Sequence, residues 1–217
     1  MDMGNLFGVN VLSFDLENIA CEGGEMSQMP SDFVDLSTLP NVRLDIRYAD
    51  DTNFMGRKVE GYDAPLCWMH KDGAIKLKQL AERLAVDGVG LHIWDAYRPR
   101  RATQDMIQWA ESTGQEWLIE QGYLVRDSRH NRGGAIDLSL YILETGELID
   151  MGTDWDFFGA ESNTFQIFGS ALEQRMRLRS SMEAVGFVPY DVEWWHFELP
   201  NATDLPVVDV PYTADKV

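Results

Sequence analysis

The sequence is poor in cysteine and contains no long hydrophobic run. Only Cys21 and Cys67 occur among its 217 residues, which is too few for a disulfide framework, and their spacing matches no zinc knuckle. We therefore expect reduced thiols in a cytoplasmic protein. No apolar stretch approaches the roughly 18 residues that a membrane-spanning helix needs, so the sequence predicts no membrane association.

Basic residues are also scarce. Lys and Arg total 18 against 36 Asp and Glu, and the net charge is −18. Nucleic acids and anionic membranes attract basic surfaces, so neither is expected as a partner. The acidic balance also argues against export, because no Lys or Arg precedes the lipoprotein-like residues 19–21 and the acids Asp2, Asp15 and Glu17 lie where a signal peptide is basic or apolar.

What the chain does contain is enough apolar sequence for a core, since hydrophobic residues make up 45%. Glycines, a proline and scattered acids interrupt any regular period at the start of the chain. We expect an N-terminal arm over residues 1–35 and one compact domain over residues 36–217. The sequence leaves open whether the domain forms a homo-oligomer and what the arm does.

Hydrophobic periodicity predicts alternating strands and helices. Strands are expected at 41–48, 91–94, 135–143 and 193–199, and helices at 74–86, 102–111 and 172–185. In the first helix, the apolar residues expected to face the core are Ile75, Leu77, Leu80, Leu84 and Val86. Because several strands follow one another, we expect an α+β fold: a single domain with a central, mainly antiparallel sheet flanked by helices.

The segment SRHNRGGAID carries the first candidate site residues, His130 and Asp137. Gly133 and Gly134 permit a tight turn between this histidine and the strand expected at 135–143. Asp137 falls on the face of that strand opposite its apolar residues. A buried carboxylate needs a cationic partner because an unpaired one is costly, and a metal ion would be such a partner.

The segment EWWHFE carries the second pair, Glu193 and His196. In an undistorted strand, side chains three residues apart point to opposite faces. Both can serve one site only if Glu193 lies in a turn or bulge before the strand. The histidine could then bind a metal while the glutamate acts on water. Trp194 and Trp195 are expected to pack and exclude solvent.

His130, Asp137 and His196 together make a set of two imidazoles and one carboxylate. This set suits zinc, and three protein ligands leave a fourth position for water, as in catalytic zinc sites. One Zn²⁺ per chain is therefore expected, and it would lower the pKa of bound water to about 7. His70 and His92 lack further ligands at suitable spacing and are expected to be structural.

The pattern S-x-H-x-x-G-x-A-x-D followed by E-W-W-H resembles the zinc D-alanyl-D-alanine dipeptidases of vancomycin resistance and peptidoglycan recycling. That family is related to D,D- and L,D-carboxypeptidases and to the signalling domain of hedgehog proteins. The resemblance extends from about residue 42 to residue 197. It includes RLDIRYADDTNFMGRKVEGY (43–62), WDAYRP (94–99), DMGTDWDFFG (150–159) and GFVPYDVEWWHF (186–197).

The resemblance implies a zinc metallopeptidase that hydrolyses D-Ala-D-Ala and similar small D,D-dipeptides, in resistance or in D-alanine salvage. It implies the following roles: zinc ligands His130, Asp137 and His196; general base Glu193; oxyanion stabilisation by Arg98; and substrate binding by Asp156 at the ammonium, by Tyr48 in the same pocket, and by Ser128. The segment between Arg98 and His130 looks shorter than in the resistance enzymes, and residues 162–164 replace a histidine-containing segment.

The sequence also allows other interpretations of these residues and of the function. Arg98 could be a surface ion-pair partner, and Asp156 could cap a helix. The chain could instead be a D,D-carboxypeptidase acting on longer peptidoglycan peptides, or a non-catalytic zinc domain that binds a partner.

Overall fold

The computed structural model of the chain describes residues 28–214. Most of the expected N-terminal arm, including Cys21, lies outside the described residues. In the described part, the expected boundary between arm and domain falls at the end of the first strand, β1 (Phe33–Asp35). This strand pairs in antiparallel fashion with β3 (Trp68–His70) to form a small two-stranded sheet.

A five-stranded sheet with the order β2-β4-β5-β7-β6 forms the centre of the fold. Strands β2 and β4 are parallel, and every other neighbouring pair is antiparallel. The expectation of an α+β domain with a mainly antiparallel sheet is therefore confirmed. The strands are β2 (Val42–Leu44), β4 (Val89–Asp95), β5 (Ala135–Ile142), β6 (Val188–Pro189) and β7 (His196–Glu198).

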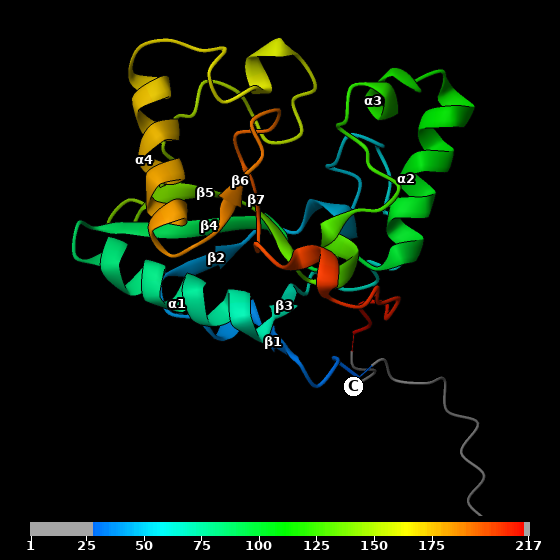
Figure 1. Ribbon diagram of the computed structural model, residues 1–217, viewed down its shortest axis with the longest axis horizontal. Coiled ribbons are helices and arrows are strands. Elements are labelled where there is room, and N and C mark those ends of the chain that lie inside the picture. The colour runs from blue at the N-terminus through cyan, green and yellow to red at the C-terminus, as the bar shows by residue number, and fades with distance from the viewer. Residues whose placement is uncertain (1–27, 215–217) are drawn as a thin grey trace, which may run out of the picture.

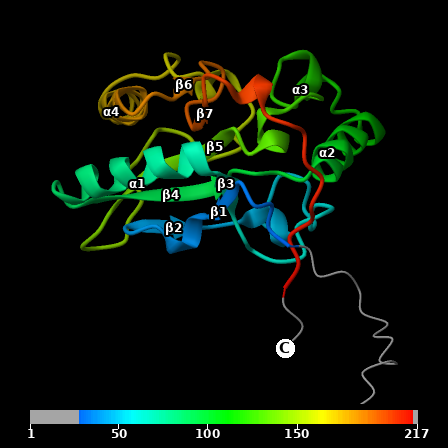
Figure 2. The same cartoon turned by 60° about the horizontal axis from the view of Figure 1, so that its bottom comes forward.

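Four helices of the described part of the chain flank this sheet. Figure 1 shows α1 and α4 on one side of the molecule and α2 with α3 on the other, and Figure 2 shows α1 running along β4. None of the helices within residues 28–214 is long and apolar enough to cross a membrane. The helices are α1 (Lys71–Ala85), α2 (Arg100–Thr113), α3 (Trp117–Glu120) and α4 (Ser170–Ala184), with 3-10 turns at 36–38, 47–49, 129–132, 160–162 and 202–204.

The buried face of α1 differs from the expected one. Ile75 is 57% exposed and Val86 is 86% exposed, so both expectations were wrong. The buried stripe instead includes Ala74 and Ala81 beside the three leucines. Positions separated by three or four residues share one helix face, and small alanines on that face allow α1 to approach the sheet closely.

Two expected strands are shorter than their sequence patterns. The strand expected at 41–48 ends at Leu44, and the strand expected at 193–199 begins only at His196. The reason for the second is a turn, in which the backbone N–H of His196 donates to the carbonyl oxygen of Glu193 at 3.1 Å. The condition required for Glu193 and His196 to face one site is thereby met.

The C-terminal segment has little regular structure but packs against the core. Tyr212 is fully buried, and its hydroxyl donates to the carbonyl oxygen of Tyr97 at 2.6 Å. Its ring also contacts Trp68, with centroids 4.5 Å apart. These contacts fix the loop that follows β4, which carries Arg98.

Strands β4 and β5 are buried on both faces for most of their length. Polar residues on them therefore lie inside the protein. Asp137 of β5 is opposite Asp95 on one neighbouring strand and opposite His196 on the other. The register of the sheet thus places three ionisable residues in a row across its centre.

Candidate active site

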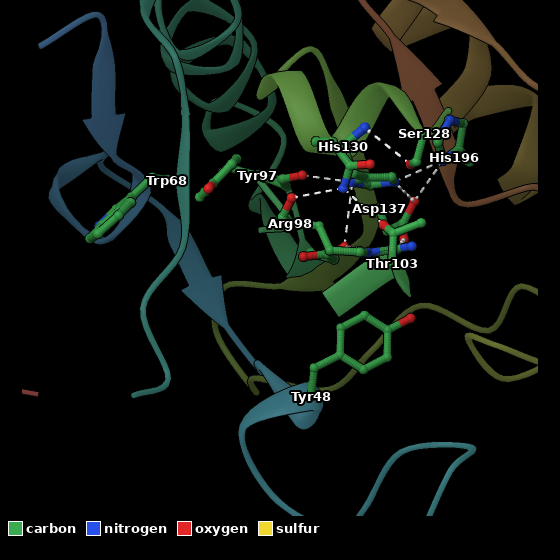
Figure 3. A network of polar contacts seen from close by, with 12 residues as sticks. Tyr48, Trp68, Tyr97, Arg98, Thr103, Ser128, His130, Asp137 and His196 are labelled. Atoms are coloured by element: carbon green, nitrogen blue, oxygen red, sulfur yellow. Dashed lines mark hydrogen bonds and ion pairs between the residues drawn. The ribbon is translucent and has the colours of Figure 1, made fainter. Parts of the chain in front are cut away.

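The side chains of His130, Asp137 and His196 converge near the N-terminal end of β5 (Figure 3). His130 Nε2 lies 3.1 Å from His196 Nδ1, and Asp137 Oδ1 lies 3.3 Å from the first nitrogen and 3.0 Å from the second. All three residues are buried, with 2–8% exposure. The three donor atoms therefore form a nearly equilateral triangle.

The turn between His130 and β5 depends on Gly133. This residue has φ of +62°, and a Cβ atom there would lie 2.4 Å from the ring of Phe33. Both the left-handed backbone and the lack of space favour glycine. Before the turn, the Ser128 hydroxyl accepts from the His130 backbone N–H at 3.3 Å and caps the short 3-10 helix that carries the histidine.

Hydrogen bonds on the outer ring nitrogens assign the tautomers of both histidines. His130 Nδ1 lies 2.6 Å from the Ala96 carbonyl oxygen, which can only accept, so Nδ1 carries the proton. His196 Nε2 lies 3.2 Å from a carboxylate oxygen of Glu198 and is protonated for the same reason. The two inner ring nitrogens and a carboxylate oxygen thus face one another, an arrangement that is satisfied by positive charge between them, carried by a proton on His196 or by a metal ion.

The triangle fits a metal ion of the size of zinc. Tetrahedral ligands bound at about 2.0–2.1 Å lie about 3.3 Å from one another, close to the three observed separations. The free ring nitrogens needed for binding already face inward. The residues His130, Asp137 and His196 therefore form a candidate metal site with a donor set of two nitrogens and one oxygen.

The pKa shifts also reflect the need for positive charge. Burial alone would raise the pKa of Asp137, but His130 and His196 hold it well below its usual range. Burial alone would lower the pKa of His196, but its hydrogen bonds to Asp137 and Glu198 raise it to about 10. Both shifts favour the charged forms, the Asp137 carboxylate and the His196 imidazolium. A bound metal cation would likewise favour the ionised carboxylate.

Glu193 lies beside this triangle, with its carboxylate 3.9 Å from His196 Nδ1. The backbone at Glu193 is held in the turn before β7, and the residue is 8% exposed. Burial raises the pKa of Glu193 well above its usual value. The structure therefore brings the expected base next to the expected ligands, with a carboxylate that accepts protons more readily than an exposed one.

Arg98 is buried and held rigidly by Asp95. Its Nε and Nη2 lie 2.9 and 2.8 Å from the same carboxylate oxygen, Asp95 Oδ2. The other oxygen of Asp95 accepts from the hydroxyl of Tyr62 at 2.6 Å. Arg98 Nη2 also approaches Asp137 at 3.9 Å. At 8% exposure, Arg98 is not a surface ion-pair partner.

Asp156 lies in a loop and caps no helix among the described residues. Its carboxylate accepts from the hydroxyl of the buried Tyr48 at 2.8 Å. Its backbone has φ of +57°, a left-handed conformation that Asp tolerates better than most residues. Burial, followed by the charge of Asp137, raises the pKa of Asp156 to about 8.

This raised pKa predicts a change of stability with pH. In the folded protein, Asp156 keeps its proton up to about pH 8, whereas in an unfolded chain it loses it at about pH 4. Stability is therefore expected to fall as the pH rises between these values. Without bound metal, the melting temperature of Asp156→Asn should rise relative to wild type as the pH increases from about 5 to about 8. A difference that does not change with pH would contradict the shift.

A cavity of about 240 Å³ joins these groups. It is lined by the five residues expected to bind metal or act in catalysis and by the three expected to bind substrate. In the view of Figure 3, Tyr48 and Ser128 lie on opposite sides of Asp137. Aromatic side chains complete the wall: Phe54, Tyr123, Phe158 and Tyr190.

The sequence analysis missed several residues that contact the site. Asp95 lies in WDAYRP, three residues before Arg98, a spacing that is compatible with an ion pair. Glu198 is two residues from His196 and so on the same strand face, which could have identified it. Nothing local pointed to Trp155, whose Nε1 lies 3.5 Å from Asp137 Oδ2.

Two histidines and two tryptophans that were expected to be structural lie outside the metal triangle. His70 caps α1, and His92 accepts from Arg43 Nε at 2.8 Å, so neither belongs to the cluster. Trp194 and Trp195 are 3% and 1% exposed and do not line the cavity.

Comparison with known proteins places this site in context. The sequence profile of the D-ala-D-ala dipeptidase family matches residues 29–216. A D-alanyl-D-alanine dipeptidase of Enterococcus faecium is 39% identical over 187 residues, covering 76% of this chain and 93% of that protein. The D-alanyl-D-alanine dipeptidase of Escherichia coli K12 is 33% identical over 181 residues, covering 82% and 90%.

A D-alanyl-D-alanine dipeptidase of Enterococcus faecalis V583 is 38% identical over 189 residues, covering 80% of this chain and 90% of that protein. Among solved structures, that of the LD-carboxypeptidase LdcB aligns with a TM-score of 0.47 and 16% identity, covering 82% of this chain and 73% of that one.

Proposed function

The chain belongs to the D-Ala-D-Ala dipeptidase family, and from this premise we propose that it hydrolyses D-alanyl-D-alanine and similar small D,D-dipeptides with zinc as its cofactor. One observation carries the proposal. The cavity has a candidate metal site with an adjacent buried carboxylate, Glu193, and a second carboxylate, Asp156, that is placed to receive an ammonium group.

His130, Asp137 and His196 would hold the zinc ion. When bound, zinc lowers the pKa of a coordinated water and polarises the carbonyl group of the substrate. The protein prepares the site by fixing the ring orientations of the two histidines and by burying the carboxylate between them. Carboxyl groups outnumber guanidinium groups in the cavity wall, so the site favours both a divalent cation and a cationic substrate group. The wall contains five carboxyl groups and two guanidinium groups: Asp127, Asp137, Asp156, Glu193 and Glu198, with Arg98 and Arg129.

Glu193 acts as general base and then as general acid. It takes a proton from the attacking water and returns it to the nitrogen of the leaving amino acid as the peptide bond breaks. Arg98 stabilises the negative charge that develops on the carbonyl oxygen. Because Asp95 holds its guanidinium in place before the reaction, little reorganisation is needed when that charge appears.

Asp156 and Tyr48 bind the free ammonium of the dipeptide. Tyr48 directs its hydroxyl at one oxygen of Asp156, which orients the carboxylate. Ser128 lies in the wall of the same cavity and is assigned to a contact with the substrate. The cavity volume of about 240 Å³ is below the roughly 300–1,000 Å³ of pockets for drug-sized ligands, in keeping with a dipeptide.

Replacing Asp156 should weaken substrate binding more than it slows turnover, because a bound ammonium favours the ionised carboxylate and pairs with it. For Asp156→Asn, we expect KM for D-Ala-D-Ala to rise about 10–100-fold, because a charged hydrogen bond of ~1.5–3 kcal/mol is lost. Steady-state kinetics measure this, with Asp154→Asn, an exposed neighbour outside the cavity, as the control. A fall in kcat with an unchanged KM would refute the binding role.

We further propose that the protein acts in the cytoplasm. Support comes from the acidic composition and from Cys67, which is buried and forms no disulfide with any residue of 28–214. Fractionation of cells that express the full chain tests this, and recovery from the cell envelope would contradict it.

The proposed activity is tested by release of D-alanine from D-Ala-D-Ala by the zinc-loaded protein, beside N-acetyl-D-Ala-D-Ala and L-Ala-L-Ala. Cleavage of the free D,D-dipeptide alone is the expected result. Cleavage of the acetylated compound in its place would make the protein a carboxypeptidase. A zinc-loaded protein that cleaves none of them would be a binding domain.

A further inference from the structure

The two histidines of the metal site are held by different kinds of group. The outer nitrogen of His130 donates to a backbone carbonyl, that of Ala96, at 2.6 Å. The outer nitrogen of His196 instead donates to the side chain of Glu198 at 3.2 Å. The ring orientation of His130 is therefore set by a main-chain carbonyl group. That of His196 depends on a side-chain carboxylate, which a mutation can remove.

The position of Glu198 follows from the strand. Residues two apart on β7 share a face, so the carboxylate lies beside the imidazole ring. The side chain of Glu198 is 34% exposed and lines the cavity. His196 gives its inner nitrogen to the metal triangle and its outer proton to this carboxylate.

The second oxygen of Glu198 faces a cation. Arg129 Nε lies 3.9 Å from Glu198 Oε2, is buried, and makes no hydrogen bond within residues 28–214. The Arg129 side chain is anchored by a hydrogen bond from Nη1 to the Asp127 carbonyl oxygen at 2.6 Å. Because Arg129 directly precedes His130, this contact connects the segments that carry the two histidines.

We propose that Glu198, steadied by Arg129, is a positioning residue that fixes the tautomer and ring orientation of His196 for the metal ion. The inference rests on His196 being a metal ligand, as in the proposed function. A carboxylate on the outer nitrogen holds the proton there, leaves the inner lone pair free, and makes that nitrogen a stronger donor. Neither residue touches the substrate in this role.

Metal affinity provides the test, because it is measured without any turnover. Competition with a chromophoric chelator should show zinc bound about 10–100-fold more weakly by Glu198→Ala than by wild type. Glu198→Gln should recover part of the loss, since its amide oxygen still accepts from the ring but carries no charge. Glu173→Ala, which removes an exposed carboxylate of α4, is the control and should bind zinc like wild type.

The role of Arg129 is tested by a double-mutant cycle. Arg129→Ala should weaken zinc binding by a smaller factor than Glu198→Ala, and it should add little in the double variant because both changes act through one contact. Full additivity would show that Arg129 does not act through Glu198.

Equal zinc affinity of wild type, Glu198→Ala and Glu198→Gln would overturn the inference, with circular dichroism showing that the variants are folded. Failure of the proposed function looks different: wild type would bind zinc with an affinity that depends on Glu198 and yet cleave no dipeptide. A wild-type protein that binds no zinc would refute both.

Discussion

Replacing Glu193 by Gln should lower kcat for D-Ala-D-Ala by about 10²–10⁴-fold, the range for loss of a general base, while zinc content stays unchanged. Glutamine has the same shape but cannot accept the proton of the attacking water. Because Glu193 is not one of the three converging donors, the metal site should survive the change. Glu193→Ala should lose activity to a similar extent.

The measurements for Glu193 are steady-state kinetics beside metal analysis. Glu173→Gln is a matched control, since it neutralises an exposed glutamate of α4 that does not line the cavity. The raised pKa of Glu193 adds a second readout. Activity should fall as the pH drops through this pKa, so the acidic limb of kcat/KM should lie above pH 4.3, roughly the usual glutamate value. A variant that keeps wild-type kcat would remove Glu193 from the mechanism.

Replacing Arg98 by Lys should lower kcat by about 10²–10³-fold, the range seen when a preorganised oxyanion donor is lost. Lysine keeps the positive charge beside the buried Asp95 but offers a point charge in place of a planar fork. It cannot both pair with Asp95 and present a second fixed donor to the substrate. We therefore expect a folded protein with slow turnover and little change in KM.

Arg98→Ala would be a poorer test, because it leaves Asp95 buried without its cation. Breaking a buried pair in this way costs about 3–5 kcal/mol, so the loss of activity would be mixed with loss of stability. Thermal denaturation of both variants separates the effects. Arg126→Lys, at an exposed ion pair with Glu111, is the control. Wild-type kcat in Arg98→Lys would contradict the proposed role. It would show either that a positive charge alone is sufficient for turnover or that this residue does not contribute to it.

Local patterns in the sequence located the central elements well. The strand expected at 135–143 is observed at Ala135–Ile142, and the helix expected at 172–185 is observed at Ser170–Ala184. Hydrophobic periodicity predicted less well which side chains are buried, since Ile75 fits the apolar pattern but faces solvent. Which stripe of a helix is buried depends on where it meets the sheet, and neighbouring residues do not encode that contact.

The candidate site was predicted as a set of residues, but their roles stay predictions until they are tested. Motif spacing singled out His130, Asp137, Glu193 and His196, because their chemistry is carried by short strings. Tyr48 and Asp156, separated by 108 residues, came only from the family resemblance, and the structure joins them by a hydrogen bond of 2.8 Å. No local pattern could have paired them.

The sequence by itself determined which chemical groups this protein has: two imidazoles, a carboxylate on the polar face of a strand, and a glutamate that could serve the site only from a turn or bulge. The tertiary structure alone decided how they meet. The register of β4, β5 and β7 aligns Asp95, Asp137 and His196, and the outer contacts of the histidines go to Ala96 and Glu198. The physical reason is that strand register and loop placement are set by packing between residues distant in the chain.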